Sequence, residues 1–448
     1  MERPRLDDNV VSRLARWARA ARLYSDLLAA ARLSPAALAQ LRHRRLAASL
    51  SHAYATVPYY RRAFEQAGMK PGDVRTEEDL VRLPITSKED LRRLPREEVV
   101  SSAVPPERFR AYVTSGSTGV PFTYYRTMDD QLRFLMSVYR SMVLLGLRWT
   151  DRLVSIGDIF YVRGTPVQRL GLLRTEVLNP LEPLERQIEL LRVFRPTALV
   201  LHPSAARVLG LALLERNVLL PPVRLVFTTS ELLDQPTADL IRHVFGAAPR
   251  SVYGMFEVGR VGWQCLPGGL HHVADDLVIA EVVRGEERVP DGETGELVVT
   301  TLTYRDMPYI RYRTGDLVRK APRACACAHS FGQIELIGGR VSELLVLPDG
   351  TLRPPLFITS HIHRVPGIVQ YQLRQERVEA VTIQIVTGAG YDEGAGDRLH
   401  REMEAILPGV RIIIERVLEI PRTPGGKHRY VVVSPEVRAR IPTPSALS

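Results

Sequence analysis

The stretch that decides the fold is Tyr112-Val113-Thr114-Ser115-Gly116-Ser117-Thr118-Gly119-Val120-Pro121-Phe122. Four hydroxyls and two glycines fill positions 114–119, and residues 111–113 and 122–125 on either side are typical of strands, which predicts a hairpin tip. Gly116 and Gly119 allow positive φ, so consecutive N–H groups can point at one anion, and the hydroxyls add donors for phosphate oxygens. An ordinary polar turn is the alternative, and the loop lacks the Gly-Lys-Ser/Thr ending of the nucleoside-triphosphatase P-loop.

Length and composition limit the class of protein. At 448 residues the chain is expected to contain two or three domains. It has no run of eighteen apolar residues, so no transmembrane helix is expected. Near the N-terminus an arginine recurs at every third residue from Arg13 to Arg22, which interrupts the apolar core that a secretory signal requires. We therefore expect a cytoplasmic protein without a membrane partner.

The net charge of +10 raises the question of a nucleic-acid partner. The basic residues are, however, spread along the chain and interleaved with acidic ones, so we expect no nucleic-acid binding. Arginine supplies almost all of the cations, a bias typical of a genome-wide codon preference. The remaining lysines are of interest, because guanidinium does not replace a compact ammonium on a flexible stem. They are Lys70, Lys88, Lys320 and Lys427.

From residue 110 to about 300, short β-rich segments alternate with helical patterns. The candidate strands are residues 152–156, 197–202, 223–228 and 250–253, and the clearest helices are residues 181–193 and 236–244. This alternation predicts α/β layers around a mixed, largely parallel sheet. Polar or glycine-rich tips after strands, such as residues 228–231 and Tyr253-Gly254, are where such sheets bind ligands.

The two ends of the chain differ from this central region. Residues 8–56 are predicted to be helical within an N-terminal region of residues 1–108, and Ser87 is placed to cap a later helix. The remaining predicted elements are antiparallel strands at 277–283 and 296–300, strands near 343–347, 368–374, 381–386 and 410–415, and a helix at 395–406. We therefore predict a large α/β domain, with layered α/β and β subdomains, over residues 1–340. A small α+β domain follows over residues 341–448.

Four further stretches carry polar side chains that a purely structural role does not require. Tyr253-Gly254-Met255-Phe256-Glu257 places a carboxylate directly after a predicted strand. Tyr312-Arg313-Thr314-Gly315-Asp316 places another carboxylate at a turn, and Gly339-Arg340 lies at the predicted domain boundary. Pro421-Arg422-Thr423-Pro424-Gly425-Gly426-Lys427-His428-Arg429 puts one of the few lysines on a glycine-flanked loop.

In this order and spacing, the five stretches resemble the adenylate-forming (acyl-CoA synthetase) superfamily. Within it they are similar to the phenylacetate–CoA ligase branch and its capsule-biosynthesis-type relatives. The resemblance covers nearly the whole chain, and Val57-Pro58-Tyr59-Tyr60 and Leu83-Pro84, with Lys88 and Asp90, look like N-terminal signatures of that branch. It implies activation of a carboxylic acid by ATP as an acyl-adenylate, with release of pyrophosphate, and then transfer to an acceptor. It also implies that the small C-terminal domain is a mobile lid.

The resemblance implies roles for individual residues as well. The phosphate-binding set is Ser115, Gly116, Ser117, Thr118 and Gly119, and the other nucleotide-binding residues are Ser230, Glu231, Tyr253, Gly254, Asp316 and Arg340. Asp316 would hold the ribose hydroxyls, and Arg340 would make a second ribose or phosphate contact. Glu257 would bind Mg²⁺ on the phosphates. Lys427 would bridge the substrate carboxylate and the α-phosphate and stabilise the charge that develops between them, so Glu257 and Lys427 are the predicted catalytic residues.

The odd number of cysteines argues against a disulfide framework. Cys325 and Cys327 form a Cys-x-Cys where the phenylacetate–CoA ligase branch carries one, and Cys265 is soon followed by His271-His272. Three thiolates and one imidazole would make a closed, structural Zn²⁺ site. The register of the following strand favours His272 as the fourth ligand, with His271 as the alternative. Three unrelated reduced thiols are the other interpretation.

The sequence departs from the family pattern at two places. Phe256 stands where the superfamily usually has a Ser or Thr that contacts phosphate. After Arg340, the branch usually has an acidic hinge and then a glycine loop used in thioester formation. Here residues 341–351 read Val-Ser-Glu-Leu-Leu-Val-Leu-Pro-Asp-Gly-Thr, which leaves Ser342 or Glu343 as the hinge. This second departure concerns the transfer step rather than the adenylation step.

Three functions therefore remain in competition. The first is an ATP-dependent acid–CoA ligase, with an aromatic acid as the expectation for the branch. The second is an adenylate-forming ligase that passes the activated group to an amine, a carrier protein or another nucleophile. The third is a non-catalytic basic binding protein on a ligase scaffold, against which the presence of Glu257, Asp316 and Lys427 argues. The expected cofactors are ATP, Mg²⁺, structural Zn²⁺ and, for the first function, CoA; a homodimer is left open.

Overall fold

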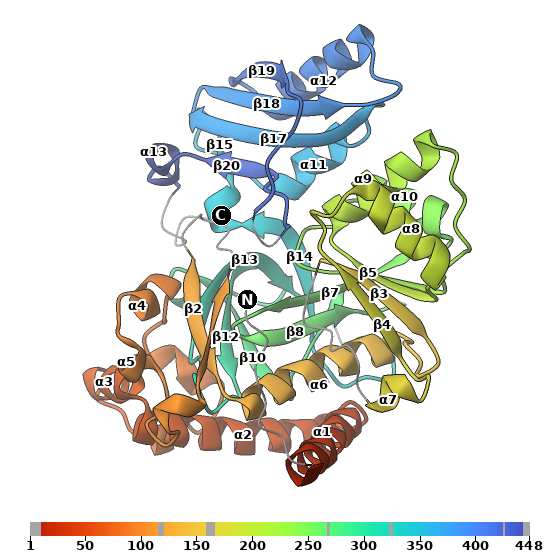
Figure 1. Ribbon diagram of the computed structural model, residues 1–448. Helices are drawn as coiled ribbons and strands as arrows, with labels where there is room; N and C mark the ends of the chain where they lie inside the picture. The colour runs from red at the N-terminus through yellow and green to blue at the C-terminus, as the bar shows by residue number, and fades with distance from the viewer. Residues whose placement is uncertain are drawn as a thin grey trace.

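The computed structural model describes residues 10–114, 121–157, 166–266, 269–321, 325, 327–423 and 426–441. The predicted phosphate-binding residues Ser115, Gly116, Ser117, Thr118 and Gly119 lie outside the described residues. In the part of the chain that is described, no helix combines the length and the apolar character that crossing a membrane requires. Figure 1 shows a large lower body, which the N-terminal helices line at its base, and a smaller unit above it formed by the C-terminal residues.

The N-terminal region is helical, as the sequence predicts. Its elements are α1 (Val10–Ala30), α2 (Pro35–Thr56), α3 (Pro58–Gln66), η1 (Pro71–Asp73), η2 (Glu78–Arg82), α4 (Lys88–Arg92), α5 (Arg96–Val99) and η3 (Pro106–Arg108). Ser34 separates the first two helices, because its side chain caps α2 by accepting a hydrogen bond from the backbone N–H of Ala37. The predicted cap at Ser87 is confirmed: its hydroxyl accepts from the N–H of Asp90, and the Asp90 carboxylate accepts from the N–H of Ser87.

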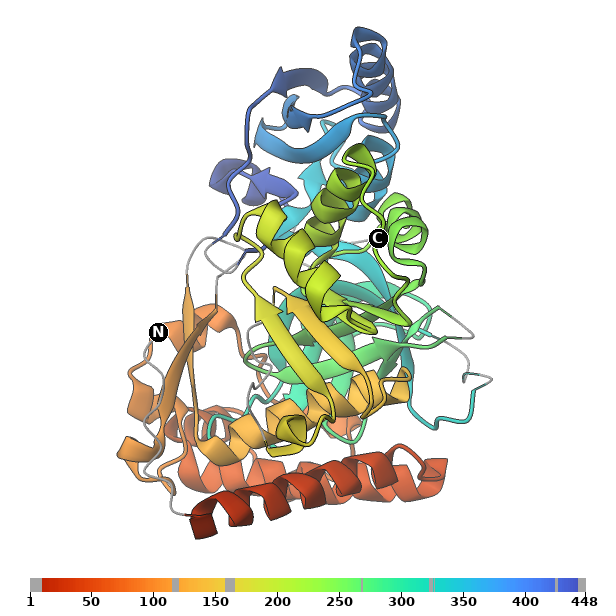
Figure 2. The same cartoon turned by 45° about the vertical axis from the view of Figure 1, so that its right-hand side comes forward.

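One large mixed sheet forms the centre of the lower body. Its strands are β3 (Arg152–Ile156), β4 (Arg174–Leu178), β5 (Ala198–Leu201), β6 (Leu225–Thr228), β7 (Pro249–Met255), β8 (Gly259–Gln264), β9 (His271–Val273), β10 (Val278–Arg284), β11 (Glu287–Arg288), β12 (Thr294–Thr301), β13 (Tyr312–Lys320) and β14 (Gln333–Arg340). Among the described residues their order is β11-β10-β12-β13-β14-β9-β8-β7-β6-β5-β3-β4. The longer helices that connect the strands from β3 to β7 lie against the faces of the sheet, as Figure 2 shows after a 45° turn.

The expectation of a largely parallel sheet is wrong for the sheet as a whole. In this sheet, as far as its residues are described, β3, β4, β5, β6 and β7 pair in parallel, and the pairs from β7 through to β11 are antiparallel. The sequence did not indicate β8 because Gly259 and Gly262 interrupt its apolar pattern. A Cβ on Gly262 would lie 2.4 Å from the carbonyl oxygen of His272, so the glycine allows β9 to approach closely.

Helices cover both faces of the parallel part of the sheet. They are α6 (Met128–Leu144), α8 (Leu184–Phe194), α9 (Pro203–Glu215) and α10 (Gln235–Phe245), and the short helix α7 (Pro166–Arg169) precedes β4. Alternate strand residues divide between the two faces, as the pleat requires. Leu153, Val200 and Phe227 pack with α6, whereas Val154, Leu199 and Val226 pack with α8, α9 and α10. Both faces are therefore buried, which explains the continuous apolar runs of these strands.

A separate hairpin carries the two strands predicted around the opening loop. β1 (Arg110–Thr114) pairs antiparallel with β2 (Phe122–Arg126), so Thr114 lies opposite Phe122 at the end where the loop begins. The predicted strands are confirmed. The conformation of the loop that joins them is outside the described residues.

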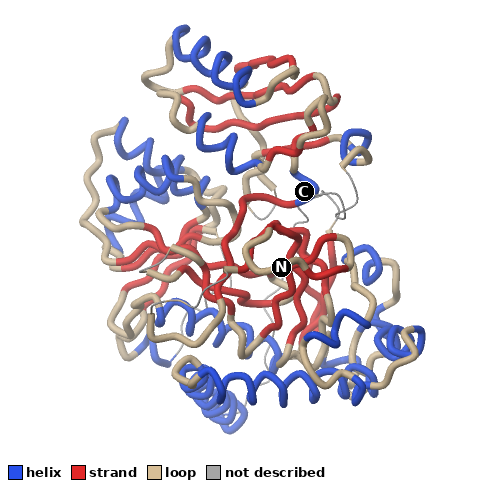
Figure 3. The backbone as a smooth tube through the Cα atoms, turned by 180° about the vertical axis from the view of Figure 1, so that it is seen from behind, coloured by secondary structure: helices blue, strands red, loops and turns tan. Residues whose placement is uncertain are grey.

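The C-terminal residues form a small unit with its own sheet. Its elements are η4 (Val341–Glu343), β15 (Leu345–Val346), β16 (Leu352–Arg353), α11 (Pro355–Ile362), β17 (Ile368–Arg377), β18 (Ala380–Thr387), α12 (Glu393–Ile406), β19 (Arg411–Arg416), β20 (Val431–Val433) and α13 (Pro435–Arg438). The four-stranded sheet has the order β19-β18-β17-β20 and is separate from the large sheet, as Figure 3 shows from behind. The sequence indicated neither α11 nor β20.

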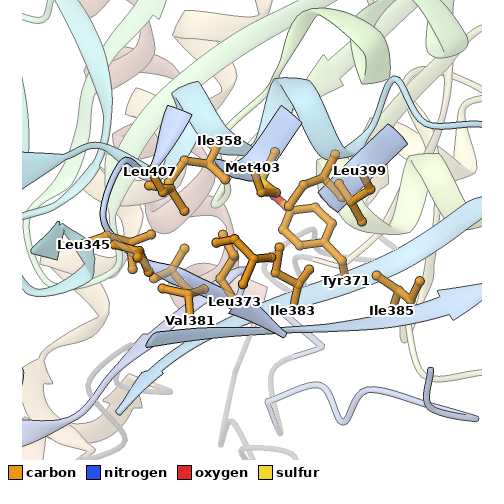
Figure 4. Packing of buried hydrophobic residues seen from close by; sticks show 14 of the residues in the cluster. Leu345, Ile358, Tyr371, Leu373, Val381, Ile383, Ile385, Leu399, Met403 and Leu407 are labelled. Carbon is orange, nitrogen blue, oxygen red and sulfur yellow. The ribbon is translucent and has the colours of Figure 1, made fainter. Parts of the chain in front are cut away.

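The core of the small unit belongs to it alone. It contains buried residues from Leu345 onwards and none from the large sheet. In Figure 4, Leu373, Ile383 and Ile385 of the small sheet face Leu399 and Met403 of α12. This core and the end of β14 at Arg340 agree with the predicted division of the chain after residue 340, which stays a prediction.

Candidate active site

A cavity of about 200 Å³ lies where the large sheet meets the small unit. It is lined by every predicted nucleotide-binding or catalytic residue that the structure describes, namely Ser230, Glu231, Tyr253, Gly254, Glu257, Asp316, Arg340 and Lys427. Thr114, the last described residue of β1, also lines the cavity. The loops after β6 and β7 contribute to this cavity, at the carboxyl ends of neighbouring parallel strands, where open α/β sheets bind ligands.

Asp316 on β13 is held in place by two donors, one from β7 and one from the adjacent strand β14. The Tyr253 hydroxyl donates to Oδ2 at 2.5 Å, and Arg340 Nε donates to Oδ1 at 3.0 Å. Burial, reinforced by the Asp316 charge, raises the pKa of Tyr253 well above its ordinary value, so the phenol stays protonated and keeps donating. The arrangement is a fixed carboxylate in the cavity wall, suited to accept hydrogen bonds from a diol.

Glu257 is a buried carboxylate, with 4% of its side chain exposed. Its Oε1 accepts from the Tyr312 hydroxyl at 3.1 Å and lies 3.1 Å from Lys88 Nζ. Burial alone would raise the pKa of Glu257, but the Lys88 ammonium and hydrogen bonds outweigh burial and lower it. An ionised carboxylate facing the cavity fits Mg²⁺, which proteins usually hold by one or two carboxylates together with the substrate's phosphates.

Sequence reasoning named Lys88 only as a branch signature and gave it no place in the site. Lys88 reaches the cavity because Thr86 joins the edge of β13, where its N–H donates to Arg311 O at 2.9 Å and its carbonyl accepts from the N–H of Arg313 at 2.9 Å. The scarcity of lysine was the available signal, since two of the four lysines line this cavity.

Arg126 holds the backbone at Glu257, and the sequence carries no signal for this role of Arg126. Its guanidinium donates to the carbonyl oxygens of Phe256 and Glu257, the latter at 3.0 Å. Its Cζ lies 4.9, 4.6 and 4.9 Å from the ring centroids of Tyr124, Phe134 and Tyr304. A buried cation surrounded by aromatic rings thus fixes the backbone from which the Glu257 carboxylate projects.

Lys427 extends into the cavity from the small unit. Its Nζ lies 4.9 Å from the centroid of the Phe256 ring, so the phenylalanine that replaces the usual hydroxyl contacts the lysine by a cation–π interaction. We call residues 421–429, which carry Lys427, the lysine loop. In this loop the hydroxyl of Thr423 accepts a hydrogen bond from the N–H of Lys427 at 3.1 Å. Gly426 packs against Pro180 with φ +77°, a conformation that favours glycine.

The three cysteines and His272 come together away from the cavity. Their ligand atoms all lie within 4.8 Å of one another; Cys265 Sγ is 3.4 Å from Cys325 Sγ, and His272 Nε2 is 3.1 Å from Cys327 Sγ. These distances are close to the roughly 3.5–3.8 Å edges of a tetrahedral zinc site. His272 Nδ1 lies 3.2 Å from Phe331 O, which fixes the ring with Nε2 directed at the sulfurs. The donor set therefore fits Zn²⁺.

His271, the alternative ligand, lies outside this group. Its Nε2 is 3.0 Å from Ser251 Oγ, because successive residues of β9 point to opposite faces. Burial lowers the pKa of His271 to about 4, so the ring is neutral. The geometry favours His272.

Comparison with curated proteins identifies the family. No protein-family model matches the chain. The phenylacetate–coenzyme A ligase of Thermus thermophilus is 28% identical over 441 residues, which cover 88% of this chain and 96% of that protein. The phenylacetate–coenzyme A ligase of Escherichia coli is 32% identical over 326 residues, which cover 69% of this chain and 72% of that protein. The chain belongs to the phenylacetate–coenzyme A ligase family.

The solved structures agree with the predicted fold class. The crystal structure of 2-hydroxyisobutyryl-CoA ligase in the postadenylation state, in complex with R3-HIB-AMP, has a TM-score of 0.76 and 21% sequence identity. The alignment covers 92% of this chain and 92% of that chain. The α/β fold of adenylate-forming CoA ligases, predicted from five ordered motifs of the phenylacetate–coenzyme A ligase family, is confirmed.

Proposed function

We propose that this protein is an AMP-forming acid–CoA ligase. It activates a carboxylic acid with ATP, releases pyrophosphate and transfers the acyl group of the acyl-adenylate to CoA. The observation that carries the proposal is the single cavity lined by all eight predicted nucleotide-binding and catalytic residues that the structure describes. Family membership supports the same reaction, and the names of the relatives support an aromatic acid such as phenylacetate as the substrate.

In the proposed adenylation step, a carboxylate oxygen of the acid attacks the α-phosphate of ATP and pyrophosphate leaves. Lys427 stabilises the negative charge that builds up between the carboxylate and the α-phosphate, an effect worth about 10²–10³ in rate for one positioned donor. Asp316 binds the ribose hydroxyls, and Arg340 holds Asp316 in place. Glu257 would hold Mg²⁺, which when bound supplies further charge neutralisation on the phosphates.

The proposal includes a structural Zn²⁺ and the division of the chain after residue 340. Zn²⁺ would be held by Cys265, His272, Cys325 and Cys327, and it would tie the turn between β8 and β9 to the segment before β14. The second feature is a small domain of residues 341–448 that carries Lys427. Its separate sheet and separate core support this division.

Pyrophosphate exchange tests the proposal directly. ATP–pyrophosphate exchange is measured with phenylacetate, benzoate and a panel of aliphatic acids, and the thioester is sought by mass spectrometry after CoA is added. We expect exchange with at least one aromatic acid and a loss of about 10²–10³-fold in Lys427→Ala. The matched control is Lys320→Ala, since that exposed lysine pairs with Asp291 at 2.9 Å on the surface.

The outcomes separate the competing functions. Absence of exchange with every acid would favour a non-catalytic binding protein, and exchange that Lys427→Ala leaves unchanged would remove Lys427 from the catalytic site. Exchange without a CoA thioester would favour transfer to an amine or a carrier protein instead.

A further inference from the structure

The carboxylate of Glu231 makes contacts that a nucleotide-binding role does not explain. Its Oε2 accepts from the backbone N–H of Ser204 at 2.9 Å. Its Oε1 accepts from the Ser204 hydroxyl at 3.0 Å and from the backbone N–H of His428 at 2.8 Å. Both oxygens are therefore engaged by protein groups, and one of these groups is the residue next to Lys427.

The contacts join three distant segments at the first turn of α9. Ser204 lies in that turn, where backbone N–H groups have no partner within the helix and the helix dipole favours a negative charge. The lysine loop is also held at its other end, because Arg422 Nη1 donates to Ser204 Oγ at 3.2 Å and to Gly426 O at 3.1 Å. We call this set of four residues, Ser204, Glu231, Arg422 and His428, the loop anchor.

The backbone beside Glu231 is strained. Ser230 has φ +72°, a left-handed conformation that a residue with a side chain rarely adopts. Such strain persists only where the surroundings impose it. The carboxylate is also ionised: burial acts to raise the pKa of Glu231, but His202 and the N–H groups of His428 and Ser204 lower it. An ionised acceptor forms stronger hydrogen bonds than a neutral one.

Helix α9 and the start of α10 also contact the small unit at a second place. Arg207 of α9 donates to the carbonyl oxygens of His363 and Ile368, at 3.2 and 3.0 Å. Asp234, which caps α10, lies 2.5 Å from His363 Nδ1. These charged groups are buried, so they hold the small unit over the cavity while the loop anchor fixes the segment that carries Lys427.

We infer that Glu231 is a positioning residue for adenylation, which ties the lysine loop to α9 and thereby holds the Lys427 ammonium in the cavity. The inference rests on the proposed function and changes the role expected for Glu231, which the sequence placed against the nucleotide. Transfer to CoA would not need Lys427 at the α-phosphate, since the adenylate is already formed. Loss of the loop anchor should therefore slow the first half-reaction and spare the second.

The test compares Glu231→Gln with Glu335→Gln, a matched control at an exposed carboxylate that pairs with Arg319 at 3.4 Å. Adenylation is measured by pyrophosphate exchange, and acyl transfer is measured by thioester release from chemically prepared acyl-adenylate and CoA. We expect Glu231→Gln to lower the adenylation kcat by about 100-fold, because a misplacement of about 1 Å has an effect of that size. The KM for ATP and the transfer step should stay within about twofold of the control.

Two results would overturn the inference. A raised KM for ATP with an unchanged kcat would mean that Glu231 binds the nucleotide after all. An equal fall in both half-reactions would mean that it serves only the stability of the fold. Arg422→Met provides a second variant, because it removes the other end of the loop anchor and should produce the same division between the half-reactions.

A readout without activity separates this inference from the proposed function. Amide hydrogen exchange of the peptide covering residues 426–434 should be faster in Glu231→Gln than in Glu335→Gln, because the His428 N–H loses its charged acceptor. Unchanged exchange would refute the loop anchor. Faster exchange in a protein that adenylates no acid would support the anchor and reject the proposed function alone.

Discussion

Replacing Gly426 by alanine should displace Lys427 without removing any charge from the cavity. A Cβ on Gly426 would lie 2.0 Å from Pro180 Cγ, whereas ordinary contacts begin at about 3.4 Å, so the loop must shift by about 1.4 Å. The proline ring is part of the backbone and cannot rotate away. Because Lys427 is the next residue, we expect the adenylation rate to fall about 100-fold in Gly426→Ala.

The control for this prediction is Gly390→Ala. Gly390 has φ +84°, and a methyl group added there would meet nothing within 4 Å. Alanine at this position therefore introduces the same kind of backbone strain, about 1–2 kcal/mol, without a collision. Pyrophosphate exchange at saturating ATP is compared for the two variants, and thermal unfolding checks that both are folded. If Gly426→Ala exchanges as fast as Gly390→Ala, the packing of Gly426 on Pro180 does not set the position of Lys427.

Three further predictions concern other parts of the molecule. Cys325→Ser should lower the zinc content, measured by plasma emission, from one ion per chain in the wild type; wild-type protein without zinc would discard the metal site. Asp316→Ala should raise the KM for ATP by roughly 10–100-fold, since a charged hydrogen-bond acceptor is lost, and unchanged kinetics would remove Asp316 from the nucleotide site. Burial lowers the pKa of His428 to about 4, below the unfolded value of 6.5, so its protonation favours unfolding. The stabilisation from the neutral ring is complete above pH 6.5 and is lost as the pH falls towards 4, and it amounts to at most about 3 kcal/mol. Denaturant unfolding should therefore show that the free energy of unfolding depends more steeply on pH in the wild type than in His428→Asn.

Local patterns in the sequence predicted many of the elements, and the exceptions have physical causes. The amphipathic repeat predicted α8 and α10, because one face of each helix is solvated and polar. Helix α9 was missed because it is apolar on nearly all sides, with Ala206, Leu209 and Leu213 buried. Helix α6 was missed because it carries buried polar residues, among them Asp130 and Arg140, that break the repeat.

The predicted site residues meet in one cavity because the order of motifs reflects a shared fold. What could not be predicted are contacts between segments that only packing brings together. Glu231 and His428 are 197 positions apart, and Lys88 reaches Glu257 only through the pairing of Thr86 with β13. Neither residue type nor spacing encodes such contacts. The role inferred for Glu231 as part of the loop anchor, in place of the predicted nucleotide contact, therefore could not be inferred from the sequence.

The scarcity of lysine gives this protein an unusual chemical surface. Lys70 and Lys320 are exposed, whereas Lys88 and Lys427 line the cavity. An amine-directed reagent therefore meets two kinds of lysine side chain, and under the proposed function ATP would shield one kind and leave the other reactive. The extent of labelling at four positions would report nucleotide occupancy through internal reference sites, before the acid substrate is known.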